Sequence, residues 1–390
     1  MPSADSVTPP KHGHDAPARE AILDASAAPI HPAAGLALTE ALTLLGADPG
    51  GWSHGAARAR ATLEHARAAL ADGLGVRPDE LTFHPSGAAA LTVGIEGLLH
   101  ARRRIGDRLL ASAVERSLVL LRPQVRAPVA VGATGAVDPD RYAGELTPDL
   151  AAAVLQDFNG EVGTAQPVDE VAAACREQGV PLLVDATSSF GRVGPPRSGD
   201  VLVADARTFG GPPLGLLAVR GATRWSRPGP RPEVERGREL ATPWIPVVAA
   251  TVAAWAATST DGDEPGQAHD LVTRIRAAAT GIPDTDVLGD PDARLPHVVT
   301  FSVLYADGEA ILRELGRRGF AAASGSSCTS SRLEPSHVLA AMGALTHGNV
   351  RIVLPLRAVS PERDREVDRF CAELADVVDT VRREAGVADL

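Results

Sequence analysis

The chain has 390 residues, of which 44% are apolar, and this length favours two domains because a single hydrophobic core stops growing near roughly 250–300 residues. The formal net charge of -11, without a basic cluster, argues against nucleic acid and anionic membranes as partners. No apolar run approaches the roughly 20 residues of a membrane span, and we expect no secretory signal. These features predict a cytoplasmic protein.

The N-terminal part begins with a polar, proline-containing stretch, residues 1–19, which predicts a disordered tail before a large domain over residues 20–260. Residues 56–74 place apolar and small side chains at helical spacing, and Gly75 marks the end of this predicted helix. His54 precedes the helix in a loop, where it either caps the helix or contacts a substrate.

Residues 81–99 read as a strand, a turn and a helix, with Ser86, Gly87 and Ala88 at the turn. Backbone amides at a helix N-terminus attract anions, so this turn is a candidate anion site. A helix start made of small residues that pack under a sheet explains the same pattern, and both interpretations stay open.

Three apolar runs follow one another within residues 180–219, and the first of them ends in Asp185. The second run leads into a polar turn, Asp205–Thr208, and a Gly-Gly-Pro-Pro turn precedes the third. Buried parallel strands read as continuous apolar runs, and open α/β sheets bind ligands at the carboxyl ends of such strands. This stretch therefore predicts the central wall of an α/β domain, with the ligand near Asp185 and the polar turn.

The C-terminal part, residues 261–390, predicts a small α+β domain. An acidic loop at 261–266 is expected to cap the preceding helix, and residues 295–303 read as a strand. The last helix, 361–385, carries an apolar stripe. Cys371 next to this stripe, and Cys175 on an earlier helix, are expected to be buried and unreactive, and the three distant cysteines predict no disulfide framework and no metal site.

The central stretch resembles the core of the cysteine desulfurases, which are class V aminotransferases among the fold-type I pyridoxal-phosphate (PLP) enzymes. The resemblance runs over residues 20–385, and the loop around Cys328, SGSSCTSS followed by EPSHVLAA, matches the first group of that family, the NifS/IscS-like enzymes. It implies a large domain with a mainly parallel seven-stranded sheet, a small α+β domain, a homodimer, and PLP as the family cofactor.

One position departs from the family at the centre of its chemistry. The family turn reads Ser-x-His-Lys and its lysine holds PLP as a Schiff base, whereas here the turn carries Asp205, Arg207 and, at the lysine position, Thr208. Lys11, in the predicted tail, is the only lysine of the chain, and arginine does not form imines. The resemblance therefore implies a family member in which no Schiff base forms.

Other positions of the cofactor pocket depart as well. Arg116 takes the place of a histidine that stacks on the cofactor ring, Gly160 that of an asparagine, and Ser188 that of a glutamine. Asp205 replaces a phosphate-binding serine, and a carboxylate beside a phosphate dianion is repulsive by about 1–4 kcal/mol. These changes argue against PLP occupancy.

The resemblance also marks residues that are kept. Asp185 matches the acid that binds the pyridine nitrogen, and Thr242 matches a threonine that reaches the neighbouring subunit's phosphate site. Arg351 matches the arginine that clamps the substrate carboxylate, and Cys328 matches the cysteine that carries a persulfide. The alternatives are a structural ion pair for Arg351 and an inherited loop without chemistry for Cys328.

Three functions follow, in this order. The first is a non-catalytic relative that receives or relays a persulfide on Cys328, with a sulfur donor or acceptor protein or an active desulfurase as its partner. The second is a PLP-independent enzyme in which Thr208, Arg207, Asp205 and Arg116 act on a small carboxylate. The third, an active PLP-dependent desulfurase or aminotransferase, is what the family alone implies.

Overall fold

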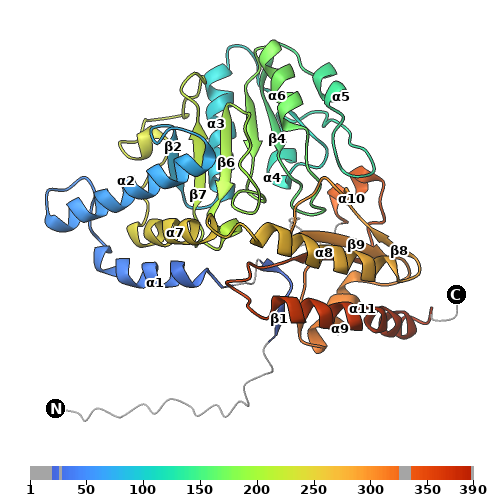
Figure 1. Ribbon diagram of the computed structural model, residues 1–390. Helices are drawn as coiled ribbons and strands as arrows, with labels where there is room; N and C mark the ends of the chain where they lie inside the picture. The colour runs from blue at the N-terminus through green and yellow to red at the C-terminus, as the bar shows by residue number, and fades with distance from the viewer. Residues whose placement is uncertain (1–19, 26–28, 325–334, 388–390) are drawn as a thin grey trace, which may run out of the picture.

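The computed structural model describes residues 20–25, 29–324 and 335–387. Within these residues a six-stranded sheet forms the centre of the large domain, in the order β2-β7-β6-β5-β4-β3 (Figure 1). Strands β3, β4, β5 and β6 run parallel, and β7 runs antiparallel to both of its neighbours. The strands are β2 (Leu81–His84), β3 (Arg108–Ala111), β4 (Leu150–Gln156), β5 (Leu182–Asp185), β6 (Val201–Asp205) and β7 (Gly215–Val219).

The seven-stranded sheet that we expected has six strands in the described part of the chain. Beyond β3, Ser112 and Val129 form only an isolated parallel bridge, with Val129 N donating to the Ala111 carbonyl at 2.8 Å. Pro128 directly precedes Val129 and has no N–H to donate, so a regular ladder cannot continue through it. In the described residues, a single bridge next to β3 therefore stands in place of a seventh strand.

Helices cover both faces of this sheet, because alternate strand residues point to opposite faces. In β6, Val201 and Val203 belong to a hydrophobic cluster that includes residues of α3 and α4, whereas Leu202 and Ala204 belong to a cluster that includes residues of α2, α6 and α7. Burial on both faces explains the continuous apolar runs of the sequence. The helices are α1 (Pro32–Ala41), α2 (His54–Leu74), α3 (Gly87–Arg102), α4 (Ser117–Leu120), α5 (Pro139–Gly144), α6 (Val168–Glu177) and α7 (Ile245–Thr258), with 3-10 turns η2 (Leu42–Leu44), η3 (Ala206–Phe209) and η4 (Glu235–Gly237).

The predicted helix after His54 begins earlier than expected. His54 is the first residue of α2, and Ser53 caps the helix by accepting a hydrogen bond from Ala56 N at 3.0 Å. Gly75 ends α2 in the left-handed conformation, at φ 66°. The capping role that we considered for His54 therefore belongs to Ser53.

A second hydrophobic core lies in the small domain, between a three-stranded sheet of order β11-β9-β8 and helices α8, α9 and α11 (Figure 1). Strand β1, near the N-terminus, pairs in parallel with β10 and places Ala21 and Leu23 in this core. The acidic loop at 261–266 runs into α8, and Asp261 N donates to the carbonyl of Thr258, the last residue of α7, at 3.2 Å. The elements are β1 (Ala21–Ile22), α8 (Glu264–Thr280), β8 (Thr285–Val287), β9 (Val298–Val303), α9 (Gly308–Arg317), β10 (Phe320–Ala321), α10 (His337–Met342), β11 (Asn349–Val353) and α11 (Arg363–Glu384).

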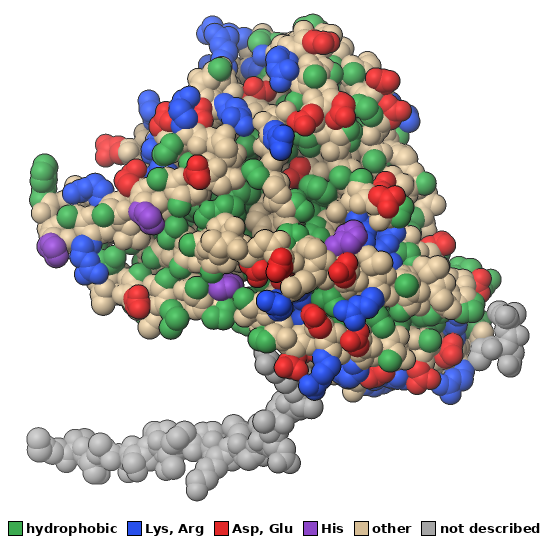
Figure 2. All heavy atoms as spheres, in the orientation of Figure 1, with side chains coloured by type: hydrophobic (Ala, Val, Ile, Leu, Met, Phe, Trp, Pro, Cys, Tyr) green, Lys and Arg blue, Asp and Glu red, His purple; other side chains and the backbone are tan. Residues whose placement is uncertain are grey.

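On the surface, acidic and basic side chains are interspersed over the face in Figure 2. Among the described residues, no helix combines the length and the apolar character that a bilayer span requires.

Candidate functional site

A cavity of about 700 Å³ lies at the carboxyl ends of β4, β5 and β6, with β9 and β11 of the small domain on its other side. Parallel strands bring their carboxyl ends to one edge of a sheet, so residues distant in sequence meet here. Seven of the predicted site residues line this cavity: Arg116, Gly160, Ser188, Asp205, Arg207, Thr208 and Arg351.

Asp205 lines the end of the cavity where the resemblance places the cofactor phosphate. Its carboxylate Oδ2 accepts a hydrogen bond from Gly87 N at 3.0 Å, at the N-terminus of α3. The same carboxylate accepts from Arg207 N at 3.0 Å and forms an ion pair with the Arg207 guanidinium at 2.8 Å. Ser86 caps α3 as well, with its hydroxyl accepting from Ala89 N at 3.2 Å. Side chains of the protein itself therefore occupy the anion-attracting end of this helix.

Thr208 stands on the η3 turn and offers a hydroxyl in place of an amine. Its hydroxyl donates to the Asp205 carbonyl, and its own carbonyl accepts from Arg192 Nε at 2.6 Å. Phe209 on the same turn packs edge-on against Trp255 of α7, with ring centroids 5.4 Å apart. Hydrogen bonds and the Phe209–Trp255 contact therefore hold the turn in place. The Thr208 hydroxyl is used in a hydrogen bond to the backbone of the same turn.

Arg116 covers the buried Asp185 carboxylate. Asp185 ends β5 and is only 2% exposed, with Oδ1 accepting from Thr187 N at 2.9 Å. Arg116 Nη1 lies 3.8 Å from Asp185 Oδ2 and donates to the Thr187 hydroxyl at 3.2 Å. Gly160 leaves room for Ser188, because a Cβ at position 160 would lie 2.5 Å from Ser188 Oγ. A guanidinium therefore lies beside the buried Asp185 carboxylate, and the Ser188 hydroxyl fills the space next to Gly160.

Two buried carboxyl groups near Asp185 were not predicted as site residues. Burial raises the pKa of Glu115 to about 8, and the nearby Asp185 adds to the effect, while Gln156 N and the Ser112 hydroxyl donate to Glu115 Oε1 and oppose it. Burial likewise raises the pKa of Asp157 to about 7, against a hydrogen bond from the Ser189 hydroxyl. Glu115 is among the residues around the cavity but is 0% exposed, so the raised pKa favours a protonated carboxyl group that is buried behind the cavity wall. Glu115 directly precedes the predicted site residue Arg116, and this position in the sequence is the signal that could have identified it.

Arg351 lies in β11 on the small-domain side of the cavity and is 7% exposed. Its backbone N donates to the Ala323 carbonyl at 2.7 Å. Burial raises the pKa of the neighbouring Glu161, and Arg351 opposes that shift by its positive charge. The arginine that the resemblance assigns to a carboxylate therefore faces the cavity near one acidic side chain of the chain itself.

The remaining predicted residues lie apart from the cavity. Ser86, Gly87 and Ala88 sit behind Asp205, while His54 is exposed on α2 and Thr242 is half-buried before α7. Among the described residues the cavity lining includes neither His54 nor Thr242. Cys328 lies outside the described residues.

The two other cysteines differ in burial. Cys175 is buried, and burial raises its pKa to about 12. Cys371 is half-buried rather than buried, because it flanks the α11 stripe instead of lying within it, and burial raises its pKa too. Both thiols are therefore poor nucleophiles at neutral pH.

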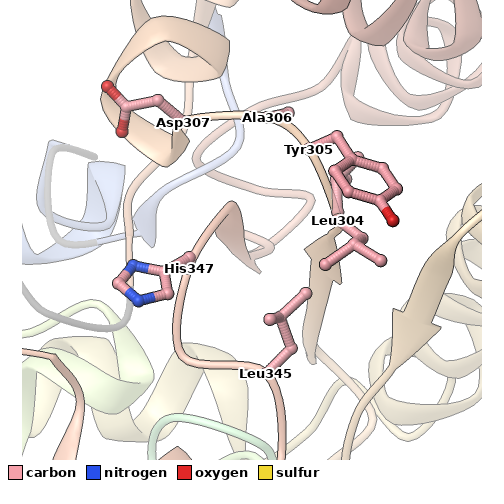
Figure 3. A pocket seen from close by; sticks show the side chains of 7 residues that line it. Leu304, Tyr305, Ala306, Asp307, Leu345 and His347 are labelled. Atoms are coloured by element: carbon pink, nitrogen blue, oxygen red, sulfur yellow. The ribbon is translucent and has the colours of Figure 1, made fainter. Parts of the chain in front are cut away.

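A second hollow, of about 500 Å³, lies on the small domain and is lined by residues 303–307, Leu345 and His347. Figure 3 shows Leu304, Leu345 and His347 around it. Asp307 is used locally, since it caps α9 by accepting from Glu309 N at 3.2 Å. No site residue predicted from the sequence lines this hollow among the described residues.

These contacts decide whether the residues of the cavity can hold PLP, the cofactor that the resemblance implies. A carboxylate sits on the helix N-terminus that would hold phosphate, and a hydroxyl bonded to backbone stands where an amine would hold the aldehyde. A Cβ on Gly87 would lie 2.7 Å from Asp205 Oδ2, so the cradle has no spare room. The residues present do not fit the phosphate or the Schiff base of PLP.

The comparisons place the chain among known proteins. Residues 23–196 match the family model "Aminotransferase class-V". A cysteine desulfurase of Klebsiella pneumoniae is 33% identical over 344 residues, covering 83% of this chain and 84% of the relative. The cysteine desulfurase IscS of Dictyoglomus turgidum is 28% identical over 341 residues, covering 82% of this chain and 86% of the relative.

Solved structures agree on the fold. A NifS-like protein superposes with a TM-score of 0.81 at 19% identity, covering 93% of this chain and 100% of that chain. The apo cysteine desulfurase from Thermococcus onnurineus NA1 gives a TM-score of 0.77 at 19% identity, with 93% and 95% coverage. At this identity the likeness concerns the fold alone.

Proposed function

The chain belongs to the cysteine desulfurase family of the class V aminotransferases, and from this premise we propose that it handles sulfur without forming a PLP Schiff base. The hydrogen bond from Gly87 N to the Asp205 carboxylate carries the proposal, because it fills the phosphate end of the pocket. The lack of a lysine after Lys11 agrees with it, since an imine needs a primary amine.

The proposed role is to receive sulfur on Cys328 from an active desulfurase. The Cys328 thiolate attacks the terminal sulfur of the donor's persulfide, a new S–S bond forms, and the donor cysteine leaves as a thiolate, so no outside oxidant is needed. The polar, glycine-containing loop suits an exposed thiol, and Cys175 and Cys371 have raised pKa values that disfavour the same reaction. A homodimer and a cytoplasmic location are part of this proposal.

A second candidate is a PLP-independent enzyme that acts on a small carboxylate. Glu115 favours it, because a carboxyl group with a pKa of about 8 at the cavity wall can donate a proton near neutral pH. Arg351 and Arg207 would then hold the substrate carboxylate.

Incubation with an active relative tests the relay. The chain is mixed with the Klebsiella desulfurase and cysteine, and each cysteine-containing peptide is then weighed by mass spectrometry. A persulfide on Cys328 that disappears in Cys328→Ser is expected. Sulfide release from cysteine by the chain alone, or sulfur found first on Cys175, contradicts the proposal.

A further inference from the structure

Two buried arginines at the junction of the two domains share one buried carboxylate. Arg363 Nη1 donates to Glu264 Oε1 at 2.6 Å, and Arg192 Nη1 lies 3.6 Å from the same oxygen. Arg192 is 6% exposed and Arg363 is 0% exposed. Asp364 lies 3.8 Å from Arg363 Nε, but its side chain is 59% exposed, so water screens its charge. The cluster therefore carries a buried excess of positive charge.

The excess charge lies on the wall of the large cavity. Arg192 and His297 both line it, and both are more than nine-tenths buried. Arg192 Nη1 and His297 Nδ1 have no hydrogen-bond partner among the described residues. A buried donor of a charged group is unfavourable when it has no hydrogen-bond partner, so this wall is incomplete without a ligand.

The neighbouring groups favour an anion at this position. Burial lowers the pKa of His297 well below its ordinary value, with Arg192 and Arg363 adding to the effect, so the imidazole is neutral. Burial also lowers the pKa of Arg192 to about 10, which still leaves the guanidinium charged at neutral pH. Arg192 Nε donates to the Thr208 carbonyl at 2.6 Å, whereas Nη1 makes no hydrogen bond and has only the longer ion-pair contact with Glu264.

We propose that Arg192 and His297 form an oxyanion subsite in this cavity, distinct from both the Asp205 end and Arg351, which takes a sulfate-like or carboxylate group of a small ligand. A guanidinium donor and a neutral imidazole suit such a group, because charge-assisted hydrogen bonds to oxyanions are short and strong. The subsite goes beyond the sulfur relay and does not depend on Cys328.

Calorimetric titration of the full chain with inorganic sulfate, and separately with succinate, tests the subsite against sodium chloride at equal ionic strength. Saturable binding is expected, weakened at least about tenfold in Arg192→Gln and kept within about threefold in Arg192→Lys, as the loss of one charge-assisted bond implies. Arg192→Gln leaves Glu264 paired with Arg363, so the fold should survive, and circular dichroism checks this.

Arg276→Gln is the matched control, because Arg276 is partly buried but does not line the cavity and donates to the Leu288 carbonyl at 3.1 Å. It should leave sulfate binding unchanged within about threefold, and a loss there equal to that in Arg192→Gln would show that binding follows net charge and would overturn the subsite. Absence of binding above the chloride control also overturns the subsite. Because the readout is binding of a simple anion, it stays informative even if Cys328 never receives sulfur.

Discussion

Replacing Asp205 by serine should both destabilise the protein and create phosphate affinity. Two backbone donors, Gly87 N and Arg207 N, lose a buried charged acceptor, and such hydrogen bonds contribute about 1.5–3 kcal/mol. The Arg207 side chain is 61% exposed, so its ion pair adds well under about 1 kcal/mol. A total loss of about 3–6 kcal/mol lowers Tm by about 4–7 °C, since unfolding entropy near ~2.1 cal/mol/K per residue gives about 0.8 kcal/mol/K for this length.

The phosphate effect has a control directly before the same strand. Asp200, at the other end of β6, accepts from Leu182 N at 2.9 Å, so Asp200→Ser loses a similar bond far from the α3 N-terminus. Differential scanning fluorimetry with and without inorganic phosphate should show added stabilisation in Asp205→Ser only, because the helix amides become free. Equal responses to phosphate in Asp205→Ser and Asp200→Ser would refute the assignment of Asp205 as an internal phosphate substitute.

Three further predictions concern catalysis, pH and thiol chemistry. Thr208→Lys alone should not yield cysteine desulfurase activity, because Asp205 still fills the phosphate end; sulfide release by this variant would show otherwise. Glu115 has a raised pKa, so its stabilising contribution is present below its ordinary value of 4.5 and is lost as pH rises through about 8; urea unfolding between those pH values should show a shallower decline in Glu115→Gln. Alkylation of the native protein should label Cys328 before Cys371 and Cys175, and peptide mapping would expose the reverse order.

The strands of the large domain could be predicted from sequence because they are buried on both faces. Val201–Asp205 and Leu182–Asp185 lie where their apolar runs indicated. That the large-domain sheet has six strands rather than seven in the described residues could not be predicted in the same way. Pro128 prevents regular pairing next to β3, but the sequence alone does not show that this proline lies beside the sheet.

The candidate site was predictable in composition but not in contacts. The sequence indicated that Asp205 stands in a phosphate pocket, whereas its bond to Gly87 N joins residues 118 positions apart and depends on the packing of α3 against β6. The cluster of Arg192, His297 and Glu264 comes from three separate segments, none of which carries a motif. These residues matter because the fold buries them close together, and no local sequence pattern indicates that burial.

Borohydride reduction of the protein in the presence of PLP tests the central claim most directly. The intact chain and the Klebsiella desulfurase are treated side by side, and the peptides are mapped by mass spectrometry. The account predicts a covalent pyridoxyl adduct on a lysine of the desulfurase and none within residues 20–387 of this chain, where no lysine occurs. A reduced adduct on the folded part of this chain, or a visible absorption band that borohydride removes from Lys11→Arg protein, would contradict it.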